Sequence, residues 1–242
     1  MRLLLLSNST MPGEEYLDYP KNEIKKFLGE KPVTAVFIPY AAVTFSFDEY
    51  CEKVENRFAE LGHHIKGIHT FNNPVKAIEK ADAIVVGGGN TWQLVRMMHD
   101  NKLMNPIREK VFNQTPYIGW SAGSNVACPT LCTTNDMPII DPKGFECISL
   151  VPFQINPHYL DANPEGHGGE TRQQRIEEFT TLSPDIYVTG LREGTMFKLT
   201  NNKLELIGDR PCRIFRNGEK PYELTKDDDL NFLLKEGFAN LK

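Results

Sequence analysis

The sequence lacks two features: an apolar run of membrane-spanning length and an excess of positive charge. Its N-terminal apolar run, Leu3–Leu6, is short and gives way to Asn8 without a cleavage-site pattern, so it is interpreted as a buried strand rather than a secretion signal. Lys and Arg number 27 against 32 Asp and Glu, for a net charge of −5. This balance excludes nucleic acid as an electrostatic partner. We expect a cytoplasmic protein with neither a membrane nor a nucleic-acid partner.

The sequence also lacks the common patterns of metal and phosphate sites. Its five cysteines are odd in number and irregularly spaced, which indicates free thiols in a reducing compartment. No H-E-x-x-H pattern occurs, and His167 with Glu170 has no evident third ligand. The Gly87–Gly89 run does not fit a nucleotide-binding loop, because that register needs glycine where Trp92 stands and no Walker lysine follows. We expect no metal and no cofactor.

The first half of the chain alternates apolar strands with amphipathic helices. A capping box, Ser46 with Glu49, starts a helix that runs to about Leu61. Another helix follows Gly87–Gly89 and carries Trp92, Leu94, Val95 and Met98. Repeated βα units of this kind predict an α/β fold with a mostly parallel sheet and helices on both faces. The expected strands are Leu3–Leu6, Val33–Ile38, Ile65–Ile68, Ala83–Val86 and Pro116–Gly119.

The second half has a different character. Residues 128–170 are rich in proline and loops, and a helix is expected at Thr171–Thr181 and a strand at Ile186–Thr189. Two apolar runs around Asn201 and Asn202, at residues 196–199 and 204–207, predict a C-terminal β-hairpin. Arg213–Phe215 adds a further candidate strand. With no internal repeat and no linker, we expect residues 1–242 to form a single α/β domain.

The five residues from Gly119 to Gly123 match the G-x-S-x-G nucleophile elbow, with Ser121 at the centre. A turn that merely matches this pattern is the alternative. The apolar strand before it and the helix after it favour the elbow, which exposes the serine hydroxyl at the carboxyl edge of the sheet. Side chains at Gly119 and Gly123 would collide with the crowded strand–turn–helix crossing.

A serine nucleophile needs a base, an acid that orients the base and an oxyanion hole. We favour His158 as the base because it follows the apolar stretch Leu150–Ile155 at the end of an expected strand. His167 is the rival, but its glycine-rich surroundings would orient an imidazole less firmly, so we place it near the substrate. Either Asp136 or Glu193 can supply the acid, and the sequence does not decide between them. The expected oxyanion donors are the N–H groups of Ala122, Gly88 and Gly89.

These motifs together resemble the peptidase E family, the aspartyl dipeptidases among the serine peptidases. The likeness covers nearly the whole chain and lies in residues 87–91, 119–124, 156–158, 169–172 and 193–194. It implies a class I glutamine amidotransferase-like (flavodoxin-like) fold in which serine replaces the usual cysteine nucleophile. It also implies a metal-independent peptidase that cleaves dipeptides with N-terminal aspartate. Separately from the resemblance, we expect a monomer or homodimer, and the sequence does not decide between them. On this resemblance Arg172 is expected to bind the aspartate side chain, and Glu170 or another carboxylate the free α-amine.

Three other interpretations share some of these features. An α/β-hydrolase esterase has the same elbow, but its catalytic histidine lies near the C-terminus, whereas the last histidine here is His167 and a hairpin follows it. A related exopeptidase, for example one acting on polymeric aspartate, would differ in the length of substrate it accepts. A flavodoxin-like ligand-binding domain without activity is the non-enzyme alternative.

Overall fold

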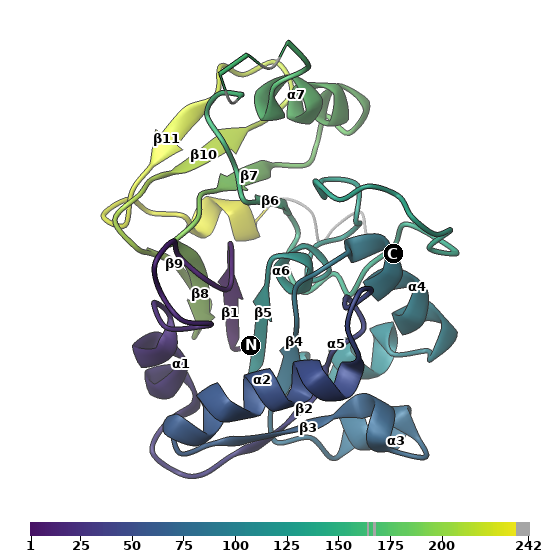
Figure 1. The fold of residues 1–242 in the computed structure, drawn as a ribbon. Coiled ribbons are helices and arrows are strands. Elements are labelled where there is room, and N and C mark those ends of the chain that lie inside the picture. The colour runs from purple at the N-terminus through teal and green to yellow at the C-terminus, as the bar shows by residue number, and fades with distance from the viewer. Residues whose placement is uncertain (164, 167, 236–242) are drawn as a thin grey trace.

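The computed structural model describes residues 1–163, 165–166 and 168–235, which contain two sheets (Figure 1). The larger sheet has the order β3-β2-β4-β5-β1-β8-β9. Its strands are β1 (Leu3–Leu6), β2 (Thr34–Ile38), β3 (His64–Gly67), β4 (Ile84–Val86), β5 (Tyr117–Trp120), β8 (Met196–Thr200) and β9 (Lys203–Ile207). The smaller sheet has the order β11-β10-β7-β6, with β6 (Gln154–Pro157), β7 (Val188–Leu191), β10 (Cys212–Phe215) and β11 (Tyr222–Leu224).

The larger sheet confirms the predicted mostly parallel α/β fold. Strands β3, β2, β4, β5 and β1 are parallel to their neighbours. The hairpin β8–β9 turns at Asn201 and Asn202, which have the positive φ angles that asparagine tolerates, and adds two antiparallel strands beside β1. The N-terminal apolar run is therefore a central strand, completely buried.

Alternate side chains of each strand point to opposite faces of the larger sheet. Because the strand residues on both faces are apolar and buried, helices cover both faces. Leu4 and Leu6 pack with helices α1 (Lys21–Leu28) and α2 (Phe47–Glu60) on one face. Leu3 and Leu5 lie in the core on the other face. The helices packed there are α3 (Pro74–Glu79), α4 (Thr91–Asp100), α5 (Met104–Phe112) and α6 (Ala122–Asn125).

The smaller sheet, with α7 (Arg172–Leu182), was not predicted as a separate layer (Figure 1). Its strands β6 and β7 are parallel, and β10 and β11 are antiparallel additions. Two short 3₁₀ helices complete the described structure, at Ile68–Thr70 and Asn231–Leu234. No helix within the described ranges has the length and apolarity needed to cross a membrane.

Ser7 joins the two sheets at their carboxyl ends. It directly follows β1, is fully buried, and donates a hydrogen bond of 2.7 Å from its hydroxyl to the carbonyl of Leu191 at the end of β7. The same hydroxyl accepts a hydrogen bond of 2.9 Å from the backbone N–H of His158, which follows β6. The ends of β1, β6 and β7 are thereby brought to one place.

Candidate active site

Ser121 occupies a strained turn between β5 and α6. Its φ of 53° and ψ of −113° lie outside the regions that an L-residue ordinarily adopts. Such a conformation costs about 1–3 kcal/mol and persists only where the surroundings enforce it. Here the Ser121 N–H donates to the carbonyl of Leu6 at 3.1 Å, which ties the turn to β1.

The two glycines of the elbow allow the strand, turn and helix to pack at backbone distance. A Cβ atom on Gly119 would lie 2.3 Å from the carbonyl oxygen of Gly123, and one on Gly123 would lie 2.1 Å from that of Val86. Real Cβ atoms do not approach oxygen so closely. The predicted collision is confirmed, and the elbow has no room for any larger residue at either position.

His158 lies between Ser121 and Glu193 in a continuous chain of hydrogen bonds. Its Nε2 is 2.9 Å from the Ser121 hydroxyl oxygen, and its Nδ1 is 2.6 Å from Oε1 of Glu193. His158 has φ 53° and is held through its backbone N–H by Ser7. A carboxylate on Nδ1 holds the proton there and leaves Nε2 free to accept the serine proton.

Of the two acids that the sequence left open, the structure brings Glu193 to His158 and places Asp136 elsewhere. The Asp136 carboxylate accepts hydrogen bonds from the N–H and the hydroxyl of Thr91, at 2.7 and 2.6 Å, and from the Thr134 hydroxyl. Thr91 is the first residue of α4, so Asp136 attaches its loop to the start of the helix that follows Gly87–Gly89. A carboxylate is favourable there because of the helix dipole.

The candidate oxyanion donors lie beside the serine. A Cβ on Gly88 would be 3.0 Å from Cβ of Ser121, which shows how closely the glycine loop passes. Within the described residues, the N–H groups of Gly88, Gly89 and Ala122 donate no hydrogen bond. Unpaired N–H groups next to a nucleophile are suited to a developing oxyanion.

A cavity of about 340 Å³ opens in front of Ser121. Tyr50 forms one wall: its hydroxyl donates to the carbonyl of Gly88 at 2.9 Å and accepts from Trp120 Nε1 and the Tyr16 hydroxyl, both at 3.1 Å. Burial raises the pKa of Tyr50 to about 12, so it stays a neutral donor. The lining residues are Ser9, Tyr16, Phe45, Tyr50, Lys53, Gly88, Gly89, Trp120, Ser121 and His158.

This chemistry agrees with comparisons to known proteins. Residues 3–207 match the sequence profile of Peptidase family S51. The chain belongs to Peptidase family S51. It is 53% identical to the Peptidase E of a Nostoc species over 97% of both chains. It is also 47% identical to the Peptidase E of Salmonella typhimurium, over 93% of this chain and 97% of the relative.

Two solved structures share the fold of this S51 chain. A peptidase from an acI-B1 Actinobacterium aligns with a TM-score of 0.65 and 17% identity, over 95% of this chain and 96% of the other. A putative Peptidase E protein from Listeria monocytogenes aligns with a TM-score of 0.57 and 21% identity, over 93% and 98%. The family match and the named relatives confirm the main prediction, that this chain is a serine dipeptidase. The family also implies that its substrates are peptides.

Arg172 and Glu170, two of the residues expected to bind substrate, do not line the cavity in front of Ser121. Arg172, at the start of α7, lines a small cavity of about 40 Å³ that includes Asn135 and Asn156, and it does not line the cavity of Ser121. Burial, and then the neighbouring Arg175, lower the pKa of Arg172. Glu170 lies 3.7 Å from Arg175 and is exposed. His167 lies outside the described residues.

Sequence reasoning missed the residues that frame the S51 site from a distance. Ser7, Tyr16 and Tyr50 carry no motif, because a buried serine or tyrosine in an ordinary strand, loop or helix looks like any other. The one available signal was that Ser7 directly follows the first strand of a parallel sheet, at the edge where sites gather.

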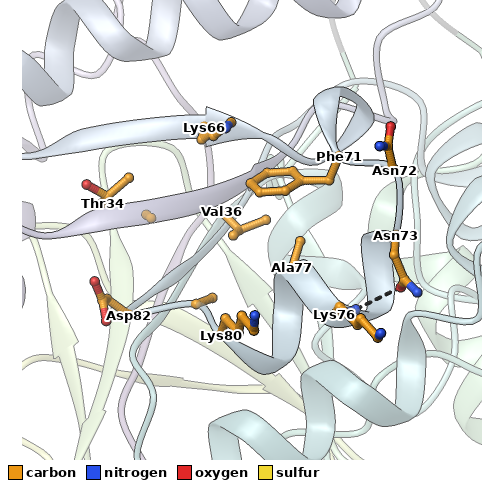
Figure 2. Close-up of a pocket in the computed structure, with 12 residues that line it drawn as sticks. Thr34, Val36, Lys66, Phe71, Asn72, Asn73, Lys76, Ala77, Lys80 and Asp82 are labelled. Atoms are coloured by element: carbon orange, nitrogen blue, oxygen red, sulfur yellow. Dashed lines mark hydrogen bonds between the residues drawn. The ribbon is translucent and has the colours of Figure 1, made fainter.

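A second cavity, of about 510 Å³, lies at the edge of the larger sheet between β2, β3 and α3 (Figure 2). Lys66, Lys76 and Lys80 line it, and the Phe71 ring points into it (Figure 2). It shares no lining residue with the cavity of Ser121, and no serine, cysteine or histidine among the described residues lines it. We therefore assign it no part in hydrolysis.

Proposed function

We propose that this S51 peptidase hydrolyses dipeptides with N-terminal aspartate through an acyl-enzyme on Ser121. The observation that carries the proposal is the unbroken hydrogen-bond chain from Glu193 through His158 to the Ser121 hydroxyl, next to free N–H groups. An esterase of the α/β-hydrolase type would use the same chemistry, but the family match favours peptide bonds.

The reaction follows from this arrangement. His158 Nε2 takes the hydroxyl proton as Ser121 Oγ bonds to the carbonyl carbon of the first residue. The oxyanion accepts hydrogen bonds from Ala122 and from Gly88 or Gly89. His158 then gives its proton to the leaving amine as the C–N bond breaks. A water molecule gives a proton to His158 as its oxygen bonds to the carbonyl carbon of the aspartyl ester. The C–O bond to Ser121 then breaks, Oγ takes the proton back from His158, and aspartate leaves.

Arg172 is our proposed reader of the aspartate side chain. Among the described residues it forms no ion pair, and the nearby carboxylate of Asp136 already accepts hydrogen bonds from Thr91 and Thr134. A guanidinium with this freedom can bind a carboxylate bidentately. Its cavity includes Asn135, whose side chain donates to the carbonyl of Pro157, the residue before His158. The α-amine is assigned to Glu170 or another nearby carboxylate.

We also propose one functional domain in the cytoplasm, as a monomer or homodimer. Ser121 comes from the larger sheet, whereas His158 and Glu193 come from the smaller one, so neither sheet alone carries the site. All five cysteines are free, and Cys128, Cys147 and Cys212 are buried, which suits a reducing compartment.

The experiment is release of p-nitroaniline from Asp-p-nitroanilide, beside the Asn and Ala analogues, with and without EDTA. We expect selective turnover of the Asp compound that EDTA leaves unchanged, because His158 supplies the base. Ser121→Ala should lower kcat by on the order of 10⁴-fold or more, and Arg172→Ala should remove the preference for Asp. Full activity in folded Ser121→Ala would refute the mechanism, and an unchanged Asp preference in Arg172→Ala would refute the assignment of Arg172.

A further inference from the structure

Lys53 contributes the positive charge in the wall of the catalytic cavity. It projects from α2 and lines the same space as Ser121 and His158, while remaining exposed to solvent. Its Nζ lies 4.1 Å from the ring centroid of Tyr16, a cation–π contact that gives the ammonium a preferred place. Within the described residues, Lys53 takes part in no ion pair.

The aromatic wall connects this charge to the reacting centre. The Tyr16 hydroxyl donates to that of Tyr50, which in turn donates to the carbonyl of Gly88 in the oxyanion loop. Tyr50 lies three residues before Lys53 in α2, so both side chains project from the same side of the helix. The Lys53 ammonium therefore lies on Tyr16, which is hydrogen-bonded through Tyr50 to Gly88, beside Ser121.

The charges of the site match those of an Asp-Xaa dipeptide. Such a substrate carries two carboxylates, one on the aspartate side chain and one at the C-terminus of the leaving residue. Arg172 and Lys53, neither of which forms an ion pair within the described residues, line separate cavities, and that of Lys53 also holds Ser121. Of the residues that the structure describes, no Asp or Glu lines the cavity that holds Lys53. If Arg172 takes the side chain, Lys53 is left to face the other carboxylate.

We propose that Lys53 binds the C-terminal carboxylate of the dipeptide and thereby restricts the enzyme to substrates of two residues. This inference rests on the proposed dipeptidase function. A compact, strongly hydrated ammonium at an open position suits a group that must return to water when the product leaves. A longer peptide would place its first carboxylate beyond reach and an uncharged amide at this position.

The test compares Asp-Leu, which has the carboxylate, with Asp-Leu-amide, which lacks it. Wild-type enzyme should cleave Asp-Leu with a kcat/KM about fivefold higher, the upper end of the range for one exposed charge pair. Lys53→Met keeps the apolar stem over Tyr16 and removes the charge. It should raise KM for Asp-Leu about fivefold and leave kcat unchanged, because the contact forms in both ground and transition states. Turnover of Asp-Leu-amide should not change.

Lys66→Met is the matched control, because Lys66 also lies over an aromatic ring, Phe71 at 4.7 Å, but in the cavity at the sheet edge. It should leave both substrates unaffected. Equal losses on Asp-Leu and Asp-Leu-amide in Lys53→Met would assign Lys53 to another part of the substrate and overturn the proposal. Unchanged KM for Asp-Leu would overturn it as well.

A failure of the proposed function is distinguishable from a failure of this inference. If the wild-type enzyme preferred another N-terminal residue, the acid and amide of that dipeptide would be compared in the same way. Binding can also be measured by calorimetry in Ser121→Ala, where turnover does not intervene. There Lys53→Met should weaken binding of the dipeptide acid about fivefold and leave binding of the amide unchanged. An equal effect on both would refute the role of Lys53.

Discussion

Replacing Glu193 by Gln tests the acid of the site, because the change removes a charge and keeps the shape of the side chain. His158, as the base, becomes positively charged when it takes the serine proton. The carboxylate of Glu193, 2.6 Å from Nδ1, stabilises that charge as it develops. An interaction that strengthens on the way to the transition state acts on kcat rather than on KM.

The magnitude follows from the geometry. Two unit charges whose centres are about 4 Å apart interact by roughly 4 kcal/mol at an effective dielectric constant of about 20. Since 1.36 kcal/mol corresponds to tenfold in rate, this is about 10³-fold. The side chains of His158 and Glu193 are 38% and 37% exposed, so solvent screens the pair. We expect Glu193→Gln to lower kcat by about 10²–10³-fold.

Asp136→Asn is the matched comparison, because it removes the same charge from the other candidate acid. Its carboxylate binds Thr91 and Thr134, so we expect a loss of about 1–3 kcal/mol in the free energy of unfolding. The kcat of Asp136→Asn should fall by less than about tenfold, because this carboxylate does not contact His158. Both variants are assayed on Asp-p-nitroanilide after urea denaturation has confirmed their folding. A deeper loss of kcat in Asp136→Asn than in Glu193→Gln would refute the reasoning.

Two further predictions concern the packing around Ser121. Gly123→Ala should destabilise the protein by about 3 kcal/mol or prevent folding, because its Cβ would meet the Val86 carbonyl, whereas Gly168→Ala has open space and should change nothing. Both can be compared by urea denaturation. Tyr50→Phe should cost about 1–3 kcal/mol of unfolding free energy, because it leaves the buried Nε1–H of Trp120 without an acceptor. An unchanged denaturation midpoint in Gly123→Ala would contradict the first expectation, and one in Tyr50→Phe would contradict the second.

The elements of the larger sheet were predictable because their signals are local. Continuous apolar runs predicted the central strands, and the capping box at Ser46 and Glu49 is present at the start of α2. The elbow was visible because backbone crowding allows only glycine at positions 119 and 123. Each of these features depends on neighbours within a few residues along the chain.

The smaller sheet and the choice of acid depend on contacts between distant parts of the chain. Strands β6 and β7 are four residues each and pair across more than thirty positions, so neither has a periodicity that identifies its partner. From the sequence, both Asp136 and Glu193 were expected in loops, and either could have oriented His158. Only the pairing of β6 with β7 brings Glu193 to His158, while the same fold takes Asp136 to α4.

The distance between Ser121 and His158 is set by how the two sheets meet, since each sheet carries one of these residues. Ser7 fixes that meeting point, because its single hydroxyl binds the backbone of His158 and the carbonyl of Leu191, two residues before Glu193. The strand that Ser7 follows also accepts the N–H of Ser121 through Leu6. One buried strand end therefore contacts the backbone at or near all three members of the hydrogen-bond chain. The N-terminal apolar run thus supports the reacting geometry as well as the core.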